Sequence, residues 1–456
     1  MRVVDKIVTV LGAGRSGISA AILLAKHEAR VRISEMNKNL KTPDLLAIFN
    51  EHGIEYEFAH HSEQIFHSDF VILSPGIPTS SPIVRELNIR DIPVYSEIEV
   101  ASWFSESPII AVTGSNGKTT TTSLIADMLN RCGVDAVACG NIGHSFSQAV
   151  YTAIVSGTGT HPMYVTEISS FQLETTKDFK PNVAVILNIT PDHLDRYDSF
   201  LDYALTKCRI LINQEKEDVA VLNRDDEVIN AHAKTRAYVI PVSKKKLPDS
   251  IAYFDGESFS FKLQDTWHHL EKKDIKLFGI HNEYNIASAA SAVSPFIKNH
   301  QGVFTSLREF ESIPHRIEFA GEAGNIRFYN DSKGTNIDAV KMAIQSFNSP
   351  LHLILGGRDK DSNFKELASY LSDKDSIYVI GEASKKIQQQ LAAFSPLACY
   401  DMKTAVMAAF ERAHPGDAVL FSPACASFDQ YSDYAARGDH FKRIVKNIMG
   451  LGNESK

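Results

Sequence analysis

A short apolar run that leads into a glycine-bracketed turn and then a helix is the feature that most constrains the fold of this chain. The run Ile109–Thr113 has the composition of a buried strand, and the turn begins at Gly114. Lys118, Thr119 and Thr120 then open a helical segment. Glycines let such a turn curl so that its N–H groups and the helix N-terminus face an anion. The segment therefore predicts an α/β layer with a phosphate site at the end of this strand.

The side chains of this turn suit a nucleoside triphosphate. Lys118 can reach the outer phosphates, and the Thr119 hydroxyl can hold Mg²⁺. Two residues, and not the usual four, separate Gly114 from the Gly117-Lys118 pair. The preceding strand and the following helix nevertheless favour a site for ATP over a chance Gly-Lys-Thr.

Size and composition bound the function. A chain of 456 residues is too long for one core, so two to three domains are expected. The net charge of −8 argues against a nucleic-acid partner. The five cysteines have no paired spacing, which is compatible with a reducing cytosol. No apolar stretch is long enough for a membrane span or a signal peptide, and no long apolar seam indicates an oligomer. We therefore expect a cytoplasmic, monomeric protein without membrane insertion.

Strand-like runs alternate with helical ones through most of the chain, which is typical of α/β folds. The expected strands are 6–11, 30–34, 70–73, 109–113, 163–166, 183–187, 219–222, 326–329, 351–355, 376–380 and 418–421. This pattern predicts three domains: a Rossmann-like domain at 1–97, a central ATP-binding domain with a mostly parallel sheet at 98–302, and a Rossmann-like α/β domain at 303–456.

The first predicted strand ends in a second glycine motif, Gly12-x-Gly14-x-x-Gly17, with Glu35 at the end of the next strand. Alone, this motif indicates dinucleotide binding, binding of another diphosphate, or only a tight strand–helix turn. The loop at Gly114 already supplies an ATP site, and nothing else suggests a nicotinamide pocket. We therefore interpret the first domain as the binding site of a nucleotide-diphosphate substrate.

Ionisable residues gather after the strands of the central domain, where α/β sheets bind ligands. Glu167 ends the strand at 163–166, where Mg²⁺ would need an oxygen ligand, although an exposed glutamate without a role is the plainer alternative. Asp192, His193, Asp195 and Arg196 follow another strand and predict a metal or phosphate role for this run.

Further polar clusters follow predicted strands or turns, and together they suggest a binding face directed toward the ATP site. They are His281-Asn282 with Asn285, His315-Arg316, the run 330–336, the run 356–360 and the run 422–429. Each cluster alone is more typical of a solvated loop.

These motifs, in this order, resemble those of the Mur ligases of peptidoglycan synthesis, and the resemblance covers essentially the whole chain. The shortened phosphate loop is the form of that family. The first glycine motif, Ser74-Pro75-Gly76-Ile77 and the run 422–430 resemble the branch that adds D-glutamate. The resemblance implies ATP-dependent ligation of D-glutamate to UDP-N-acetylmuramoyl-L-alanine through an acyl phosphate.

The resemblance also implies a role for individual residues. Those matched to ATP contacts are Gly114, Ser115, Asn116, Gly117, Lys118, Thr119, Thr120, Asn285, Arg316 and Asp331. Those matched to the UDP-linked substrate are Ser16, Glu35, Ser74, Asn141 and His193. Those matched to D-glutamate are Lys333, Thr335, Lys360, Ser427 and Phe428. The implied catalytic residues are Lys118, Glu167, His193 and Lys207, and the implied ligands of two Mg²⁺ ions are Thr119, Glu167, His193 and Lys207 as a carbamate.

Three positions depart from what the family leads us to expect. Glu35 stands for an aspartate, Asn37 for an arginine of some members, and Tyr434 for a phenylalanine. The alternatives are another Mur-type or folylpolyglutamate ligase, an ATP-driven phosphate-loop switch, and a dinucleotide-dependent oxidoreductase. A folate ligase would not need the first glycine domain, a switch would not need an acceptor amino acid, and the oxidoreductase depends on the first glycine motif only.

Overall fold

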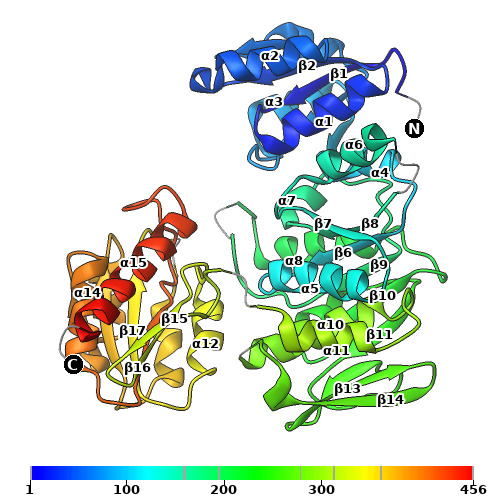
Figure 1. Cartoon of the computed structure of the whole chain (residues 1–456). Helices are drawn as coiled ribbons and strands as arrows, with labels where there is room; N and C mark the ends of the chain where they lie inside the picture. Colours follow the sequence, from blue (N-terminus) through cyan, green and yellow to red (C-terminus); the bar gives the residue numbers. More distant parts are fainter. Residues whose placement is uncertain are drawn as a thin grey trace. The chain divides into compact units, whose positions relative to one another are not determined.

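The computed structural model describes residues 3–157, 161–193, 196–277, 279–311, 314–359 and 362–453. The chain forms two compact units (Figure 1). One contains the residues up to 272 together with 284–306, and the other contains 273–283 and the residues from 307 onward.

The first unit begins with a parallel sheet of strand order β3-β2-β1-β4-β5. Its strands are β1 (Ile7–Leu11), β2 (Arg30–Glu35), β3 (Glu55–Phe58), β4 (Phe70–Leu73) and β5 (Val94–Ser96). Its helices are α1 (Arg15–Lys26), α2 (Pro43–Glu51) and α3 (Pro82–Ile89). The strand order changes direction between β1 and β4, and the first glycine turn lies beside that point. Ligands of doubly wound sheets bind in this place.

The second sheet of this unit is also parallel, with the order β11-β10-β9-β6-β8-β7. Its strands are β6 (Ile109–Thr113), β7 (Ala136–Gly140), β8 (Met163–Glu167), β9 (Val183–Ile186), β10 (Val219–Asn223) and β11 (Tyr238–Val242). Its helices include α4 (Glu97–Trp103), α5 (Lys118–Arg131), α6 (Phe146–Ser156), α7 (Ser170–Leu173), α8 (Phe200–Cys208) and α9 (Glu227–His232). The helices α10 (Ile280–Val293) and α11 (Gln301–Glu309) lie mostly in this unit, and their residues 280–283 and 307–309 belong to the second. Strand β6 is buried along its whole length and lies between β8 and β9, so its carboxyl end places the phosphate loop at the middle of the sheet edge.

A small antiparallel sheet completes the unit (Figure 1, green). It consists of β12 (Ala252–Phe254), β13 (Ser258–Leu263) and β14 (Thr266–Glu271). The strands alternate polar and apolar residues, and Phe259 and Phe261 are fully buried.

The second unit has one sheet, of order β15-β16-β20-β17-β18-β19, in which only β15 runs antiparallel to its neighbour. Its strands are β15 (Glu318–Ala323), β16 (Ile326–Asn330), β17 (Leu351–Gly356), β18 (Ser376–Ile380), β19 (Leu397–Ala398) and β20 (Ala418–Phe421). Its helices are α12 (Ile337–Ile344), α13 (Ser384–Gln390), α14 (Met402–Arg412) and α15 (Tyr434–Asn453). Two separate apolar clusters pack against this sheet, as is expected when helices cover both faces.

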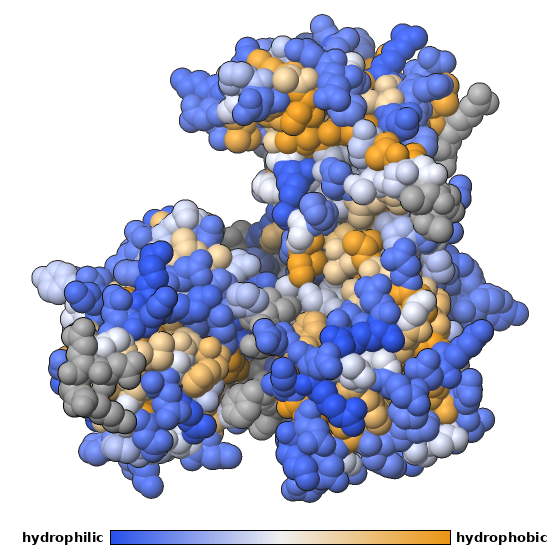
Figure 2. All heavy atoms as spheres, viewed as in Figure 1, coloured by the Kyte–Doolittle hydropathy of each residue, from blue (hydrophilic) through white to orange (hydrophobic). Residues whose placement is uncertain are grey.

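The predicted α/β class with three mostly parallel sheets is confirmed, and each predicted strand is present. Strands β3, β5, β7, β11 to β15 and β19 were not predicted. Hydrophilic side chains cover much of the face shown in Figure 2, and the hydrophobic ones lie in separate groups. Among the described residues, no helix is long and apolar enough to cross a membrane.

Candidate functional site

The loop after β6 is held in shape by the segment that follows β9. Gly114 and Gly117 have φ angles of 151° and 86°, which side chains rarely adopt. The Ser115 hydroxyl donates to the carbonyl of Thr190 at 2.9 Å, and the Asn116 N–H donates to the Asn188 side chain at 2.8 Å. The phosphate loop is therefore preorganised before a ligand binds.

Two lysines converge on this loop. The Lys118 ammonium donates to the carbonyls of Gly114 and Ser115 at 2.8 and 2.9 Å. Lys207, on α8, donates to the same Gly114 carbonyl at 2.9 Å and is 2% exposed. Burial and the nearby charge of Lys118 lower the pKa of Lys207 well below its ordinary value. Lys207 therefore loses its proton more easily than an ordinary lysine does.

Glu167, at the end of β8, has one carboxylate oxygen that is hydrogen-bonded and one that is not. Its Oε1 accepts from the Asn141 side chain at 2.9 Å, and the Asn141 N–H donates to the Glu167 carbonyl at 2.9 Å. Its Oε2 is buried without a hydrogen bond in the described part of the chain. An orphaned carboxylate oxygen beside a phosphate loop fits a divalent cation, since Mg²⁺ binds one or two carboxylates together with phosphates and water.

Three other predicted residues of the ATP site, all in the first unit, lie in or against the same loop. Thr119 and Thr120 are buried in the first turn of α5, and the Asn285 side chain lies against Gly117. His193 has a φ of 54° and its ring packs edge-on against Phe171. The described residues contain no cluster of three or more His, Cys, Asp or Glu that could hold a metal by itself. His281 and Asp195 fall outside what the structure describes at side-chain level.

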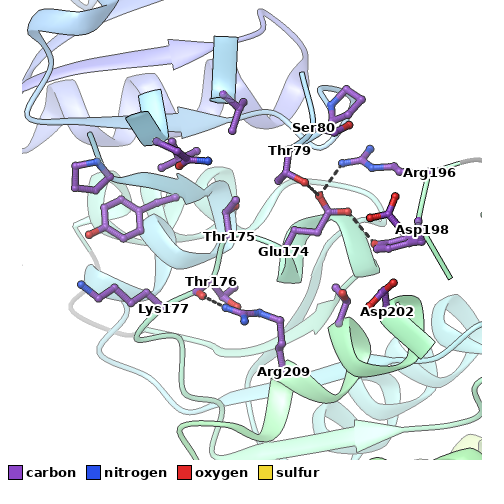
Figure 3. Close-up of a pocket in the computed structure, with 18 of the residues that line it drawn as sticks. Thr79, Ser80, Glu174, Thr175, Thr176, Lys177, Arg196, Asp198, Asp202 and Arg209 are labelled. Atoms are coloured by element: carbon purple, nitrogen blue, oxygen red, sulfur yellow. Dashed lines mark hydrogen bonds and ion pairs between the residues drawn. The ribbon is translucent and has the colours of Figure 1, made fainter. Parts of the chain in front are cut away.

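Arg196, whose run predicts a metal or phosphate role, makes its contacts here with the loop after β4 and with α7. Its guanidinium pairs with Glu174 at 3.2 Å (Figure 3). It also donates to the Pro75 carbonyl at 2.7 Å and stacks 3.8 Å over Phe171. Thr79 donates to the same Glu174 carboxylate at 3.1 Å. These contacts tie the loop after β4 to the central sheet and line a cavity of about 720 Å³. The arginine therefore joins two layers of the first unit, which a sequence pattern alone does not reveal.

The first glycine turn opens onto another cavity, of about 880 Å³, at the edge of the first sheet. Ser16, Glu35 and Ser74, all predicted for the UDP-linked substrate, line it. Ser74 donates to the Gly12 carbonyl at 3.3 Å. The Glu35 carboxylate accepts the N–H groups of Ala13 and Asn37, each at 2.7 Å, so it also braces the turn. Asn141, predicted for the same substrate, lies instead beside Glu167.

In the second unit, Asp331 lies at the end of β16 and is almost fully buried. It accepts from the Ser422 hydroxyl at 2.6 Å, and burial raises its pKa to about 6, against the opposing effects of this bond and of Arg316. Ser427, in the segment that follows β20, is buried, whereas the adjacent Phe428 is 62% exposed. Lys360 lies outside the described residues.

Arg437, on α15, is a residue that the sequence analysis missed. It is 1% exposed and donates to the Ser332 hydroxyl and carbonyl at 3.0 and 2.8 Å. It also donates to the carbonyls of Cys425 and Ala426 at 3.0 and 3.1 Å. One guanidinium thus holds together the loops that carry Lys333, Thr335, Ser427 and Phe428. No local pattern marks a helical arginine for this role.

Comparison with protein-family models gives three matches along the chain. Residues 7–83 match the MurD N-terminal domain, residues 112–293 the Mur ligase middle domain, and residues 315–425 the Mur ligase glutamate ligase domain. The chain is 39% identical to the UDP-N-acetylmuramoylalanine–D-glutamate ligase of Salinibacter ruber, over 97% of this chain and 98% of that one. It is equally identical to the ligase of that name from Chloroherpeton thalassium, over 96% and 97%.

Solved structures share the fold at low sequence identity. The MurF ligase of Thermotoga maritima in complex with ADP gives a TM-score of 0.63 at 16% identity, covering 92% of this chain and 95% of that one. The UDP-N-acetylmuramate–alanine ligase MurC of the same species gives 0.59 at 18% identity, covering 97% and 100%. With relatives this similar along nearly its whole length, the chain belongs to the Mur ligase family, in the branch of the UDP-N-acetylmuramoylalanine–D-glutamate ligases.

Proposed function

We propose that this protein joins D-glutamate to UDP-N-acetylmuramoyl-L-alanine at the expense of ATP, a step of peptidoglycan precursor synthesis. The observation that carries the proposal is the similarity to ligases named for this reaction over 97% of the chain. The convergence of the phosphate loop, Glu167 and Lys207 at one sheet edge supports it.

The chemistry follows from the poor reactivity of a carboxylate toward amines. An oxygen of the substrate carboxylate attacks the γ-phosphorus of ATP, ADP leaves, and an acyl phosphate results. The amine of D-glutamate then attacks the acyl carbon, and phosphate leaves with its bonding electrons while the amine loses a proton. Charge builds on phosphoryl and carbonyl oxygens in both steps, so the protein acts by positioning and neutralisation. Lys118 is the charge that the loop offers to the phosphates.

The residues around the loop fit Mg²⁺, which when bound neutralises phosphate oxygens. Glu167 Oε2 and the Thr119 hydroxyl would hold it, with His193 and a carbamate on Lys207 as the further ligands that we propose for two sites. The lowered pKa of Lys207 supports the carbamate, because only the neutral amine adds CO₂. The adduct replaces a cation with a carboxylate-like ligand.

We assign the substrates to the three predicted domains. The domain at 1–97 would bind the UDP group through Ser16, Glu35 and Ser74, with Asn141 and His193 near the reacting end. The domain at 98–302 would bind ATP, assisted by Asn285, Arg316 and Asp331. The domain at 303–456 would bind D-glutamate through Lys333, Thr335, Lys360, Ser427 and Phe428. We expect a monomer that works in the cytoplasm, where ATP and nucleotide-linked sugars are found.

The test is phosphate release from ATP with Mg²⁺ and UDP-N-acetylmuramoyl-L-alanine, adding one amino acid at a time. Release that requires D-glutamate and ignores L-glutamate supports the proposal. Release with a different amino acid would move the chain to another ligase of the family. Release without any acceptor would support an ATP-driven switch.

A further inference from the structure

Glu174, which directly follows α7, accepts hydrogen bonds from three side chains and has no role in the reaction so far. Its Oε2 accepts from the Thr79 hydroxyl at 3.1 Å and from the Arg196 guanidinium at 3.2 Å (Figure 3). Its Oε1 accepts from the Tyr197 hydroxyl at 2.8 Å. The side chains of Glu174 and Arg196 are only 9% and 13% exposed. One largely buried carboxylate therefore holds donors from two separate segments of the chain.

The first connection from Glu174 leads to the loop after β4. Thr79 belongs to this loop, and the Arg196 guanidinium donates to the carbonyls of Pro75 and Ile77 at 2.7 and 3.4 Å. Pro75 and Ile77 also line the cavity beside the first glycine turn. The carboxylate of Glu174 thus holds this loop directly through Thr79 and indirectly through the arginine that it pairs with.

The second connection leads to His193. The Arg196 guanidinium stacks 3.8 Å over the Phe171 ring, and the His193 ring packs edge-on against Phe171 with the ring centroids 4.9 Å apart. The Arg196 N–H also donates to the His193 carbonyl at 3.0 Å. Phe171 therefore contacts both the guanidinium and the imidazole, and the position of Arg196 affects that of His193.

The third connection leads to the phosphate loop. The Tyr197 ring packs edge-on against Tyr203 with the ring centroids 5.3 Å apart. The Tyr203 hydroxyl lies 3.0 Å from the Ser115 hydroxyl in the phosphate loop. Burial raises the pKa of Tyr197, and the charge of Glu174 adds to this effect, so the Tyr197 hydroxyl keeps its proton and donates.

We propose that Glu174 is a positioning residue that holds the loop after β4, His193 and the phosphate loop in one arrangement. It acts through Thr79, Arg196 and Tyr197, and not by contact with a substrate. Groups that act on one reacting centre must be placed closely, and a displacement of about 1 Å can lower the rate by about 100-fold. This inference rests on the reaction proposed above and adds a residue that the sequence motifs do not single out.

Glutamine and alanine should have different effects at this position. In Glu174→Gln the amide oxygen can accept from Thr79 and Arg196, while the NH₂ group donates to the Tyr197 hydroxyl, which can turn to accept. In Glu174→Ala all three donors lose this acceptor. The three connections should therefore survive in the glutamine variant and break in the alanine variant.

The test measures D-glutamate-dependent phosphate release by the full chain, with each substrate varied in turn. For Glu174→Ala we expect the KM for UDP-N-acetylmuramoyl-L-alanine to rise and kcat to fall, each by about tenfold or more. The KM for D-glutamate, which we assign to the second unit, should change by less than about threefold. Calorimetry without ATP or Mg²⁺ should show the same weakening for UDP-N-acetylmuramoyl-L-alanine. Glu174→Gln should restore every constant to within about threefold of the unmodified protein.

Asp198→Ala is the matched control. Asp198 lines the same cavity as Glu174 but is exposed, and none of the described residues forms a hydrogen bond or ion pair with it. This variant should keep all the constants of the unmodified protein.

Two results would overturn the inference, with folding of each variant checked by circular dichroism. One is a folded Glu174→Ala protein with constants within about threefold of the unmodified ones. The other is an equal rise of all three KM values without recovery in Glu174→Gln, since a general loss of structure has that effect. If Glu174→Ala does not fold, Thr79→Val should still raise the KM for the UDP-linked substrate alone, and an unchanged KM would overturn the inference. If the unmodified protein releases no phosphate with these substrates, the proposed function itself is wrong, and the role of Glu174 falls with it.

Discussion

Two buried glutamates, two residues apart on α4, should respond in opposite ways to replacement by glutamine. Both oxygens of Glu99 are fully used: Oε2 accepts the N–H groups of Lys177 and Phe179 at 2.9 Å each. Oε1 accepts the Asp178 N–H at 3.0 Å and the Trp103 indole N–H at 3.2 Å. This arrangement contains four donors and suits a carboxylate, which only accepts.

Glu99→Gln places an NH₂ group against one pair of those donors. Two buried N–H groups then lose their acceptor, at about 1–3 kcal/mol each, so we expect the free energy of unfolding to fall by about 2–6 kcal/mol. Glu97 differs, because burial raises its pKa, against the hydrogen bond from the Ser147 N–H. Its Oε1 accepts that N–H and its Oε2 is buried without a hydrogen bond in the described residues. A neutral glutamine reproduces this arrangement, so Glu97→Gln should change the free energy by less than about 1 kcal/mol.

The assay is urea unfolding followed by the fluorescence of Trp103, in a Trp267→Phe background that removes the other tryptophan. With a slope of about 2–3 kcal/mol per M, Glu99→Gln should lower the midpoint by about 0.7–3 M. The wild type should lose stability as the pH rises above 4.5, since the folded state binds the Glu97 proton more tightly than the unfolded state does. Glu97→Gln should lack this loss. Equal destabilisation by the two substitutions would show that burial alone, and not the set of donors, decides the effect.

Three further changes test the sites directly. Gly117→Ala should abolish ATP binding, measured by calorimetry, because its Cβ would collide with the Asn285 side chain and its φ is left-handed; binding within a few-fold of wild type would contradict this. Lys207→Ala should lose phosphate release and regain part of it with added acetate or formate, and absence of any rescue would count against the carbamate. Arg437→Met should raise the KM for D-glutamate more than the KM for ATP, since it loosens only the loops of the second unit; equal effects on both constants would argue against that role.

The strands that the sequence predicted are those in which apolar residues run together. Strand β6 is buried throughout, and its composition alone identifies it. Strand β3, with the sequence EYEF, lies at a sheet edge and has no fully buried residue, so nothing in its composition separates it from a loop. The antiparallel strand β13 alternates polar and apolar residues as a half-buried strand does. That alternation was present in the sequence and was overlooked.

The sequence predicts those site residues whose role depends on their neighbours in the chain. It does not reveal residues whose role depends on contacts with distant parts of the chain. The phosphate loop follows from adjacent residues, whereas the roles of Arg196 and Arg437 come from contacts to residues 121 and 105 positions away. Contacts of this kind arise from the fold, so a single sequence does not contain them in readable form.

Lys118 and Lys207 contact the same loop but differ in burial and in how readily they lose a proton. Both donate to the Gly114 carbonyl, and two ammonium groups this close repel each other. Lys207 is the more deeply buried, and its pKa is lowered well below the ordinary value. Lys207 therefore gives up its proton more readily than Lys118, which is the lysine better placed to keep its charge for phosphate. The neutral form of Lys207 is the nucleophile that the proposed carbamate requires, and addition of CO₂ there would also remove the repulsion between the two ammonium groups.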